Sequence, residues 1–552
     1  MSESTTPVAP AREPASGRPP RLPAGRAIGI AVLAVAAAIG VGHLVAGLVS
    51  PMSSPYQAVA DAVVRLAPAP LVEFGKSLAL PGLPAGRADK TALLVGVGVV
   101  LLAVAVVTGL ASRSNARPGR WVLVTLGLVG IAAVFSSPVF ALADLVAPAV
   151  AMGAGLWSFR WLHERAMADV VDQNALTGVP RSPTQGAETP DSRRMGTTRR
   201  GVLVGLGAAG AGVGGYLLGA GADVTGTAEP DLVGRLRTAS SAPPLPAGAD
   251  FAAQGTPTFL TANRDFYRID TALRVPVRAA TGWSMRVHGM VQRELTVSYQ
   301  DLLRRPLVER PVTLTCVSNE VGGDLISTAN FAGVELRPLL LEAGVLPGAD
   351  QLLSTSLDGW TAGTPTDVLL EPDRGALLAL AMNGEPLPLE HGYPVRMVVP
   401  GLYGYVSATK WLADLELTTF DAAQAYWLER GWAQLAPIKT QSRIDRPRSG
   451  ASVPAGRLTV AGIAWAQHQG VSKVEVRVDG GPWLPAELST EVSRDTWRMW
   501  RVELTVPPGP HRIESRAANG VGVPQTGARA PTVPDGATGY PEISVTASRT
   551  PI

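Results

Sequence analysis

The sequence predicts a multi-domain protein with an N-terminal α-helical transmembrane bundle, a central α+β domain and a C-terminal all-β sandwich. Three observations indicate this fold class. Nearly all long apolar runs of the 552 residues lie before about residue 222. From Thr256, short β-rich runs alternate with Gly/Pro turns and short helical pieces. After about Trp432, strand-like runs follow one another at the spacing of a small sandwich.

Five segments qualify as membrane spans, because a helix needs about 20 apolar residues to cross the hydrocarbon core. They are Ala27–Val49, Ala92–Leu110, Trp121–Phe135, Val139–Phe159 and Val202–Ala222. The third is short, and only Ser136-Ser137-Pro138 separates it from the fourth, which is typical of a tight turn. We therefore expect four spans within residues 27–160 and a fifth at residues 201–222.

Arginines predict the orientation of these spans. They concentrate in the tail 1–26, in the loop after the second span and in the linker 161–200. With five spans all three segments lie on one side, which the positive-inside rule makes cytoplasmic. We expect a multi-pass cell-membrane protein whose remainder, after Ala222, is extracytoplasmic.

Two motifs accompany the fifth span. Arg199-Arg200 precedes a weakly hydrophobic Gly/Ala-rich stretch and resembles a twin-arginine export signal, although two ordinary positive-inside arginines would look the same. Gly205-x-Gly207-x-x-Gly210 matches a dinucleotide-binding fingerprint. It lies inside an apolar run and not between a strand and a helix, so we reject a nucleotide site there.

The soluble part begins with a Gly/Pro/Ala-rich linker, predicted at residues 223–255. The α+β domain is expected at 256–431 and the Ig-like sandwich, a dimerisation type of module, at 432–552. The predicted elements of the first are strands at Ser284–Gly289, Val312–Thr315 and Val395–Val399 and helices at Ser298–Arg304 and Leu336–Ala343. Those of the second are strands at Ser452–Trp465, Val471–Val478, Trp497–Val506 and His511–Ala518.

Cys316 is the only cysteine of the chain, so it cannot form an intramolecular disulfide. Outside the cytoplasm a reduced thiol is prone to oxidation, and its retention there calls for a reason. One interpretation is a thiolate that binds a soft metal or acts as a nucleophile. The other is a small buried hydrophobic residue, and cysteine content alone leaves both open.

Several motifs surround Cys316 along the chain. They are Phe266-Tyr-Arg268-Ile-Asp270, Thr313-Leu-Thr-Cys316-Val-Ser-Asn319, Phe331-Ala-Gly333, Met382-Asn-Gly384, His391-Gly-Tyr-Pro-Val-Arg396 and Lys410-Trp-Leu412. In this order they resemble the molybdenum-binding core of the sulfite oxidase family, and the resemblance covers roughly residues 256–545.

The resemblance implies a molybdopterin cofactor whose molybdenum is held by the Cys316 thiolate. It also implies catalytic roles for Cys316 and Arg268. The residues that it places along the cofactor are Tyr267, Arg268, Asp270, Asn319, Asp358, His391, Arg396 and Lys410. The fork of Arg396 suits phosphate oxygens, because a guanidinium can bind them in a bidentate way.

The chain departs from the family after Asn319, where Glu320 and Val321 stand in place of arginines. A carboxylate there disfavours a doubly charged anion. We therefore expect two-electron oxo-transfer on a small-molecule substrate, and a neutral or weakly charged substrate fits this site better than sulfite does. The alternatives are an S- or N-oxide reductase of the same superfamily, and a cofactor-free surface binding protein with a degenerate enzyme domain.

Partners are constrained by composition and motifs. The net charge of +3, without basic runs interleaved with aromatics, gives no indication of nucleic-acid binding. The chain has no Cys-x-x-Cys-His haem motif, so we expect a separate redox partner, a cytochrome or a quinone. A homodimer through the C-terminal domain is implied by the resemblance alone.

Overall fold

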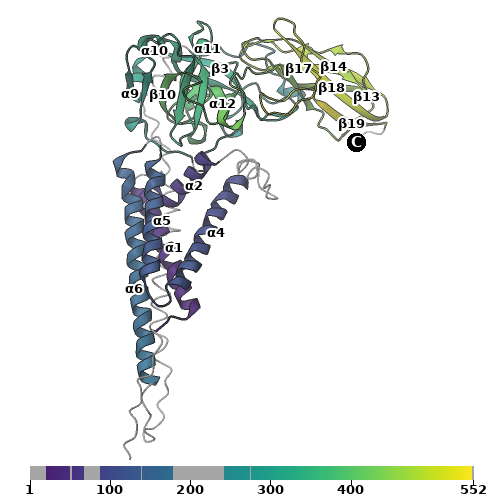
Figure 1. Cartoon of the computed structure of the whole chain (residues 1–552). Helices are drawn as coiled ribbons and strands as arrows, with labels where there is room; N and C mark the ends of the chain where they lie inside the picture. The colour runs from purple at the N-terminus through teal and green to yellow at the C-terminus, as the bar shows by residue number, and fades with distance from the viewer. Residues whose placement is uncertain are drawn as a thin grey trace, which may run out of the picture. The chain divides into compact units, whose positions relative to one another are not determined.

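A computed structural model describes residues 20–49, 53–67, 88–137, 140–177, 241–273 and 275–549 (Figure 1). The chain divides into two compact units. The first takes in the described residues up to 59, from 92 to 135 and from 141 to 177. The second takes in those from 60 to 91, from 136 to 140 and from 241 to 549. The predicted fifth span and its arginine pair lie outside the described residues.

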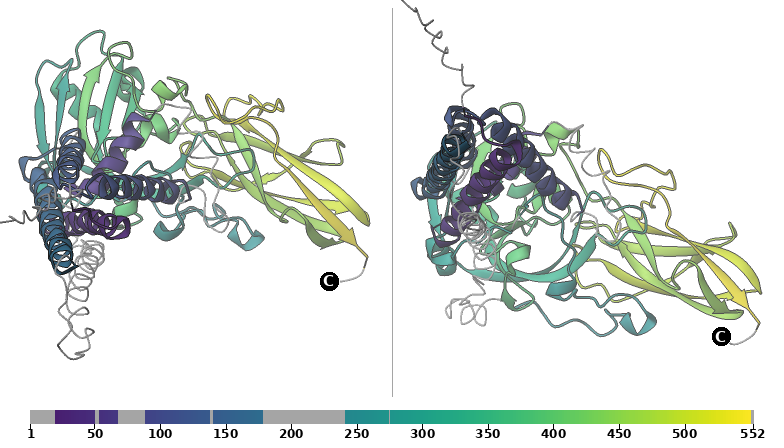
Figure 2. Two further views of the ribbon diagram at one scale, coloured as in Figure 1. Left: turned by 60° about the horizontal axis from the view of Figure 1, so that its bottom comes forward. Right: turned by 90° about the horizontal axis from the view of Figure 1, so that it is seen from below.

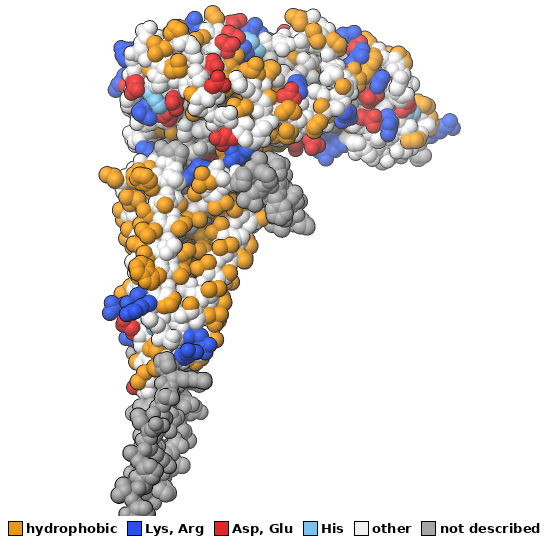
Figure 3. Space-filling view, viewed as in Figure 1, with side chains coloured by type: hydrophobic (Ala, Val, Ile, Leu, Met, Phe, Trp, Pro, Cys, Tyr) orange, Lys and Arg blue, Asp and Glu red, His pale blue; other side chains and the backbone are white. Residues whose placement is uncertain are grey.

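Long apolar helices build the first unit, although residues 88–91, the first turn of one of them, belong to the second unit. They are α1 (Ala24–Val49), α4 (Ala88–Ala111), α5 (Arg117–Phe135) and α6 (Val146–Thr177). Each is long and apolar enough to cross a membrane. Helices α1, α5 and α6 lie side by side (Figures 1 and 2), and hydrophobic side chains cover much of the visible face of the helical part (Figure 3).

Glycines let these helices approach closely. A Cβ on Gly109 of α4 would lie 2.6 Å from the Ile28 backbone of α1, and one on Gly119 of α5 would lie 2.1 Å from the Phe159 ring of α6. Small residues at such contacts are the usual device of membrane helix pairs, because apolar helices in lipid associate through close packing.

The fourth helix differs from the prediction. A 3₁₀ turn at Leu142–Leu145 precedes α6, and α6 continues to Thr177, into the predicted linker 161–200. Exposed ion pairs lie along the extension: Arg160 pairs with Glu164 at 2.7 Å one turn on, and Asp169 pairs with Arg26 of α1. The short helix α2 (Pro55–Leu66), which begins on a proline as helices often do, was not predicted.

Two sheets form the α+β domain. The first has the order β2 (Leu295–Ser298), β1 (Ser284–Gly289), β10 (Leu412–Thr418), β5 (Gln351–Ser356) and β6 (Thr361–Pro365). The second has the order β3 (Leu307–Thr315), β4 (Ile326–Glu335), β7 (Leu377–Met382) and β8 (Glu385–Pro386), with β9 (Arg396–Val398) paired to β7. The predicted helices are present as α9 (Tyr299–Arg304) and α10 (Leu336–Ala343), and α10 ends at Gly344 with φ +71°.

Two further sheets enclose a separate apolar core after residue 440. One has the order β11 (Gln441–Arg446), β13 (Gly456–Trp465), β17 (Arg498–Val506) and β16 (Glu487–Leu488). The other has the order β12 (Ala451–Pro454), β19 (Glu542–Ser548), β18 (Gly509–Asn519), β14 (Val471–Val478) and β15 (Leu484–Pro485). Val460, Val474 and Ile513 are fully buried between them. The run predicted as one strand at 452–465 is two strands of different sheets.

The packed part of the second unit begins before Thr256. Phe251 is 6% exposed and belongs to the core of the α+β domain, although it falls in the predicted linker 223–255. The Thr490 amide donates to the Gly248 carbonyl at 2.9 Å, which ties the same stretch to the C-terminal sheets. Composition predicts a linker here, whereas Phe251 and the Gly248 contact show that its last residues pack against the domains that follow.

Candidate functional site

Cys316 lies directly after β3, in the turn that leads to β4. Its amide donates to the Leu325 carbonyl at 3.0 Å, and its carbonyl accepts from the Asn319 amide at 3.1 Å. The Asn319 side chain closes the turn by accepting from the Leu325 amide at 2.9 Å. A Cβ on Gly323 would lie 2.6 Å from that same side-chain oxygen, so only glycine fits this position. Glu320 is exposed on the turn.

Tyr267 comes to the thiol from the segment before the first sheet. Its ring stacks on Phe266, with centroids 5.4 Å apart, and Phe266 contacts His391 edge to face at 5.5 Å. Burial and the charge of Cys316 raise the pKa of the Tyr267 hydroxyl. The phenol therefore stays protonated and can serve as a hydrogen-bond donor beside Cys316.

A tight junction gathers three of the predicted cationic residues. Gly392 has φ +113°, and a Cβ there would lie 3.0 Å from the Arg396 Cβ and 3.1 Å from the Lys410 Cα. Glycine at this position thus lets the His391 turn, β9 and the Lys410 segment meet. Arg396 donates to the His391 carbonyl at 3.1 Å. His391 Nε2 lies 2.9 Å from the Asn263 carbonyl, so that nitrogen carries the proton.

This junction is buried and positive. Burial lowers the pKa of Arg396 to about 10. Burial and the Arg396 charge lower the pKa of His391 to about 4, so His391 is neutral near pH 7. Burial also lowers the pKa of Lys410 to about 8, although Asp270 opposes this shift.

Asp270 holds three cations together. Its carboxylate accepts from Lys410 Nζ at 2.8 Å, from Arg268 Nε at 2.9 Å and from Lys90 Nζ at 2.6 Å. Burial opposes its ionisation, but Lys410, Lys90 and the hydrogen bonds together lower the pKa of Asp270 below its ordinary value. The pKa of Asp358 is raised mainly by burial, and the nearby negative charge of Asp270 raises it further.

The structure thus brings together all nine residues that the sequence singled out. Cys316 and Asn319 share one turn, Tyr267 faces the Cys316 charge, and the remaining six form a linked group of charged and polar side chains. Lys90 was missed, because a lysine before an apolar run reads as the flank of a membrane span. Asn263, which fixes the His391 tautomer, was also missed, because a main-chain carbonyl leaves no signal in a sequence.

The donor set fits a molybdenum atom with a phosphate-bearing organic ligand. Arg396 is 4% exposed, yet its Nε has no hydrogen-bond partner among the described residues, and no carboxylate there pairs with it. Asn319 is 3% exposed, and its Nδ2 is likewise unsatisfied within the described part of the chain. Buried polar groups in this state call for a ligand, here an anion for Arg396. Cys316 supplies the sulfur that a soft metal prefers.

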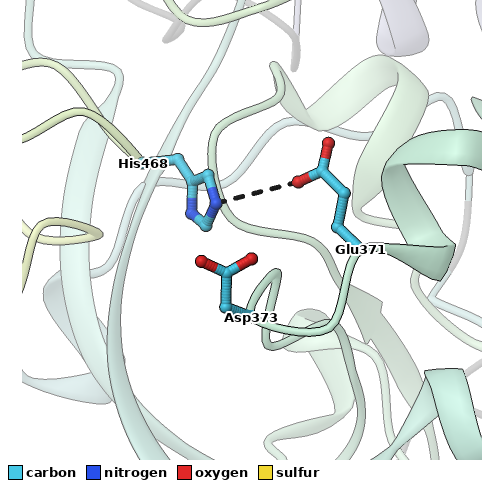
Figure 4. A group of neighbouring side chains, drawn as sticks. All are labelled: Glu371, Asp373 and His468. Carbon is cyan, nitrogen blue, oxygen red and sulfur yellow. Dashed lines mark ion pairs between the residues drawn. The ribbon is translucent and has the colours of Figure 1, made fainter.

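A second cluster offers metal-ligand types but is already neutralised. The ligand atoms of Glu371, Asp373 and His468 lie within 4.8 Å of one another (Figure 4). Glu371 pairs with Arg374 at 2.5 Å and Asp373 with Arg494 at 2.7 Å. Each carboxylate therefore has its own guanidinium, and the cluster is an ion-pair network.

Comparison with known proteins agrees with this geometry. Residues 272–427 match the family model of the oxidoreductase molybdopterin binding domain. The chain is 31% identical over 307 residues to mitochondrial sulfite oxidase of Homo sapiens, covering 46% of this chain and 54% of that protein. It is 32% identical over 298 residues to sulfite oxidase of Gallus gallus, covering 45% and 63%. It is 25% identical over 286 residues to NADH nitrate reductase of Hordeum vulgare, covering 41% and 31%.

The chain spans between about half and two thirds of the length of those sulfite oxidases. Among solved structures, the sulfane dehydrogenase SoxCD from Paracoccus pantotrophus aligns with a TM-score of 0.43 and 18% identity, covering 64% of this chain and 89% of that one. Residues 272–427 thus match a molybdopterin-binding oxidoreductase domain, and the chain is similar to sulfite oxidases over about 45% of its length.

Proposed function

We propose that this protein carries out two-electron oxo-transfer on a neutral or weakly charged substrate, with Cys316 as the protein ligand of molybdenum. The observation that carries the proposal is the buried, unpaired guanidinium of Arg396 beside His391 and Lys410. Such a group is stable only with an anion, and the phosphate of the cofactor is the anion that the family supplies.

In this proposal the bound cofactor would supply the two-electron redox chemistry, and the chain's own residues would hold the cofactor and position the substrate. Arg396, Lys410 and the neutral His391 bind the phosphate end. The Tyr267 hydroxyl, protonated near neutral pH, donates a hydrogen bond to the substrate oxygen beside Cys316. Arg268, 37% exposed and held by Asp270, faces solvent at the same site and meets the incoming substrate.

The substrate class follows from the charge beside the thiol. Glu320 is exposed in the Cys316 turn, and Val321 next to it carries no charge. A fixed carboxylate repels sulfite but not a sulfoxide or an amine oxide. In the reductive direction the substrate loses its oxygen as water, consuming two electrons and two protons from a donor. In the oxidative direction water supplies the oxygen, and the electrons pass to an acceptor.

We further propose that the protein is anchored in the cell membrane with the molybdopterin domain on the extracytoplasmic side. The four long apolar helices support the membrane anchor. The orientation rests on the arginine distribution together with the fifth span expected at residues 201–222. The electrons would then pass to or from a separate cytochrome or quinone. A phosphatase fused after the last residue would be active outside the cytoplasm, and a fluorescent protein fused there would not be; the reverse pattern would contradict the orientation.

A homodimer through residues 432–552, an Ig-like module, is a further expectation, which sedimentation of the purified protein would test.

The test of the proposed chemistry begins with metal analysis. The purified full chain should carry about one molybdenum per chain, and Cys316→Ser should carry none. It is then assayed with reduced viologen and methionine sulfoxide or trimethylamine N-oxide, and separately with sulfite and a dye acceptor. We expect turnover of the neutral oxides and slow sulfite oxidation. Glu320→Ala should raise kcat/KM for sulfite about tenfold, since removing one nearby like charge is worth about 1–2 kcal/mol. Fast sulfite oxidation by the unmodified protein would refute the substrate assignment.

A further inference from the structure

The first turn of α4 belongs to the same compact unit as the candidate site. The described residues between 60 and 91 lie in the second unit, and Lys90 is the third residue of α4. Its side chain is 22% exposed, and its Nζ donates to Asp270 Oδ1 at 2.6 Å and to the Ala272 carbonyl at 2.7 Å. Lys90 therefore lies outside the matched residues 272–427, yet it contacts the carboxylate that holds Arg268 and Lys410.

The two oxygens of the Asp270 carboxylate have different partners. Oδ2 accepts from Arg268 Nε at 2.9 Å and from Lys410 Nζ at 2.8 Å, whereas Oδ1 accepts from Lys90. The torsion that turns a carboxylate about its Cβ–Cγ bond is broad, so the aspartate rotamer alone does not fix which oxygen faces which cation. Lys90 fixes this, because its ammonium ties Oδ1 to the Ala272 carbonyl.

Ala272 is a firm anchor for the Lys90 ammonium. It is 3% exposed and packs in a small apolar cluster with Leu357 and Trp411, which are 6% and 1% exposed. Its carbonyl cannot shift without disturbing this packing. The orientation of the Asp270 carboxylate is thus set relative to the packed part of the domain.

Arg268 depends on this carboxylate more than Lys410 does. Lys410 also donates to the Glu390 carbonyl at 3.1 Å, and its Nζ lies 4.4 Å from the centroid of the Trp411 ring. Arg268 is 37% exposed, and Asp270 is its ion-pair partner among the described residues. The contact uses Nε, which leaves the N–H groups of the two terminal nitrogens available for a substrate oxygen.

We propose that Lys90 is a positioning residue for the substrate: it holds the Asp270 carboxylate so that Arg268 presents its terminal nitrogens to the substrate oxygen. The inference rests on the proposed function, in which Arg268 meets the substrate. The competing role for Lys90 is charge balance alone, because Asp61 of α2, which lines a small hollow with Asp358, also lies near the Lys90 charge.

Lys90→Met tests the proposal, because it removes the ammonium and keeps an unbranched side chain. Lys473→Met, which removes an ion pair with Glu475 in β14, is the matched control. The full chains are purified in detergent and assayed with reduced viologen and trimethylamine N-oxide or methionine sulfoxide. We expect the KM of Lys90→Met to rise about fivefold, with kcat changed less than about twofold and molybdenum per chain unchanged. Lys90→Arg keeps the charge and should restore KM in part, and the control should leave both constants unchanged.

An Arg268→Met background separates positioning from charge balance. In that background Lys90→Met should change KM less than about twofold, because a residue that acts through Arg268 has nothing left to position. A rise of the same size in both backgrounds would assign Lys90 to charge balance and overturn the proposal. An unchanged KM in the single variant, or a loss of molybdenum from it, would overturn the proposal as well.

Arg268 can also be followed without turnover. Phenylglyoxal modifies arginine side chains, and mass spectrometry of the peptide that contains Arg268 gives the rate in the cofactor-free chain. We expect modification about threefold faster in Lys90→Met than in the unmodified chain and the control, because a guanidinium bound to a carboxylate is held back from the reagent. Equal rates would overturn the proposal. If the unmodified chain reduces neither oxide, the substrate assignment falls, and the modification rate still decides whether Lys90 positions Arg268.

Discussion

The strongest single test of the site's electrostatics is Asp270→Asn. The Asp270 side chain is 3% exposed and pairs with Lys90, Arg268 and Lys410, which are 22%, 37% and 11% exposed. In the variant, Lys90 and Arg268 can turn toward water, but Lys410 is left as a buried charge without its carboxylate. Losing one partner of a buried pair costs about 3–5 kcal/mol, and the oxygen retained by asparagine favours the lower figure.

The expected loss of about 3 kcal/mol in unfolding free energy corresponds to a lower midpoint of thermal unfolding. A unit of about 300 residues unfolds with an entropy near 0.6 kcal/mol/K, so its midpoint should fall by about 5 °C. The assay is thermal unfolding of the full cofactor-free chain in detergent at pH 7, followed by tryptophan fluorescence. Because the Asp270 pKa lies below its ordinary value, its stabilisation is complete at neutral pH and is lost as the pH falls below about 4, so the variant and the unmodified chain should converge in acid.

Asp265→Asn is the matched control. This aspartate lies five residues earlier, its side chain is 62% exposed, and it pairs only with the exposed Arg264 among the described residues. Its replacement should change stability by less than about 0.5 kcal/mol. Adding Lys410→Met to Asp270→Asn should recover part of the loss, because the unpaired buried charge is then removed. A midpoint for Asp270→Asn within 1 °C of the control would refute this account.

Three further predictions concern the same domain. In the cofactor-free chain, His391 binds a proton near pH 4 instead of 6.5, so stability should fall by about 3 kcal/mol from pH 7 to below 4, and His391→Gln should remove that slope in pH-dependent unfolding. Gly333→Ala places a Cβ 2.0 Å from the Leu378 carbonyl of β7 and should cost at least about 3 kcal/mol, whereas Gly282→Ala, with open space around it, should not; equal midpoints would contradict the packing argument. Arg396→Lys keeps the charge but loses the fork, so pterin fluorescence per chain should drop about tenfold without a change in the fold's circular dichroism; full pterin content would argue against phosphate at Arg396.

The helices of the first unit could be predicted because their signal is local. A run such as Ala27–Val49 is apolar along its whole length, and length with hydropathy suffices to predict a helix. The extension of α6 to Thr177 could not be predicted in this way. Its side chains include Asp169, which pairs with Arg26, a residue 143 positions earlier in the chain.

For the candidate site, too, some features could be predicted from the sequence and others could not. The sequence by itself determined the residue types and their order, from Arg268 through Cys316 and Arg396 to Lys410, because a family motif is a pattern along the chain. Only the tertiary structure decided that Asp270 faces Lys410 across 140 residues and Lys90 across 180. Only folding likewise sets Asp61 against Asp358. The physical reason is that burial and Coulomb interactions depend on distances in space, and no periodicity along a chain encodes the meeting of segments so far apart.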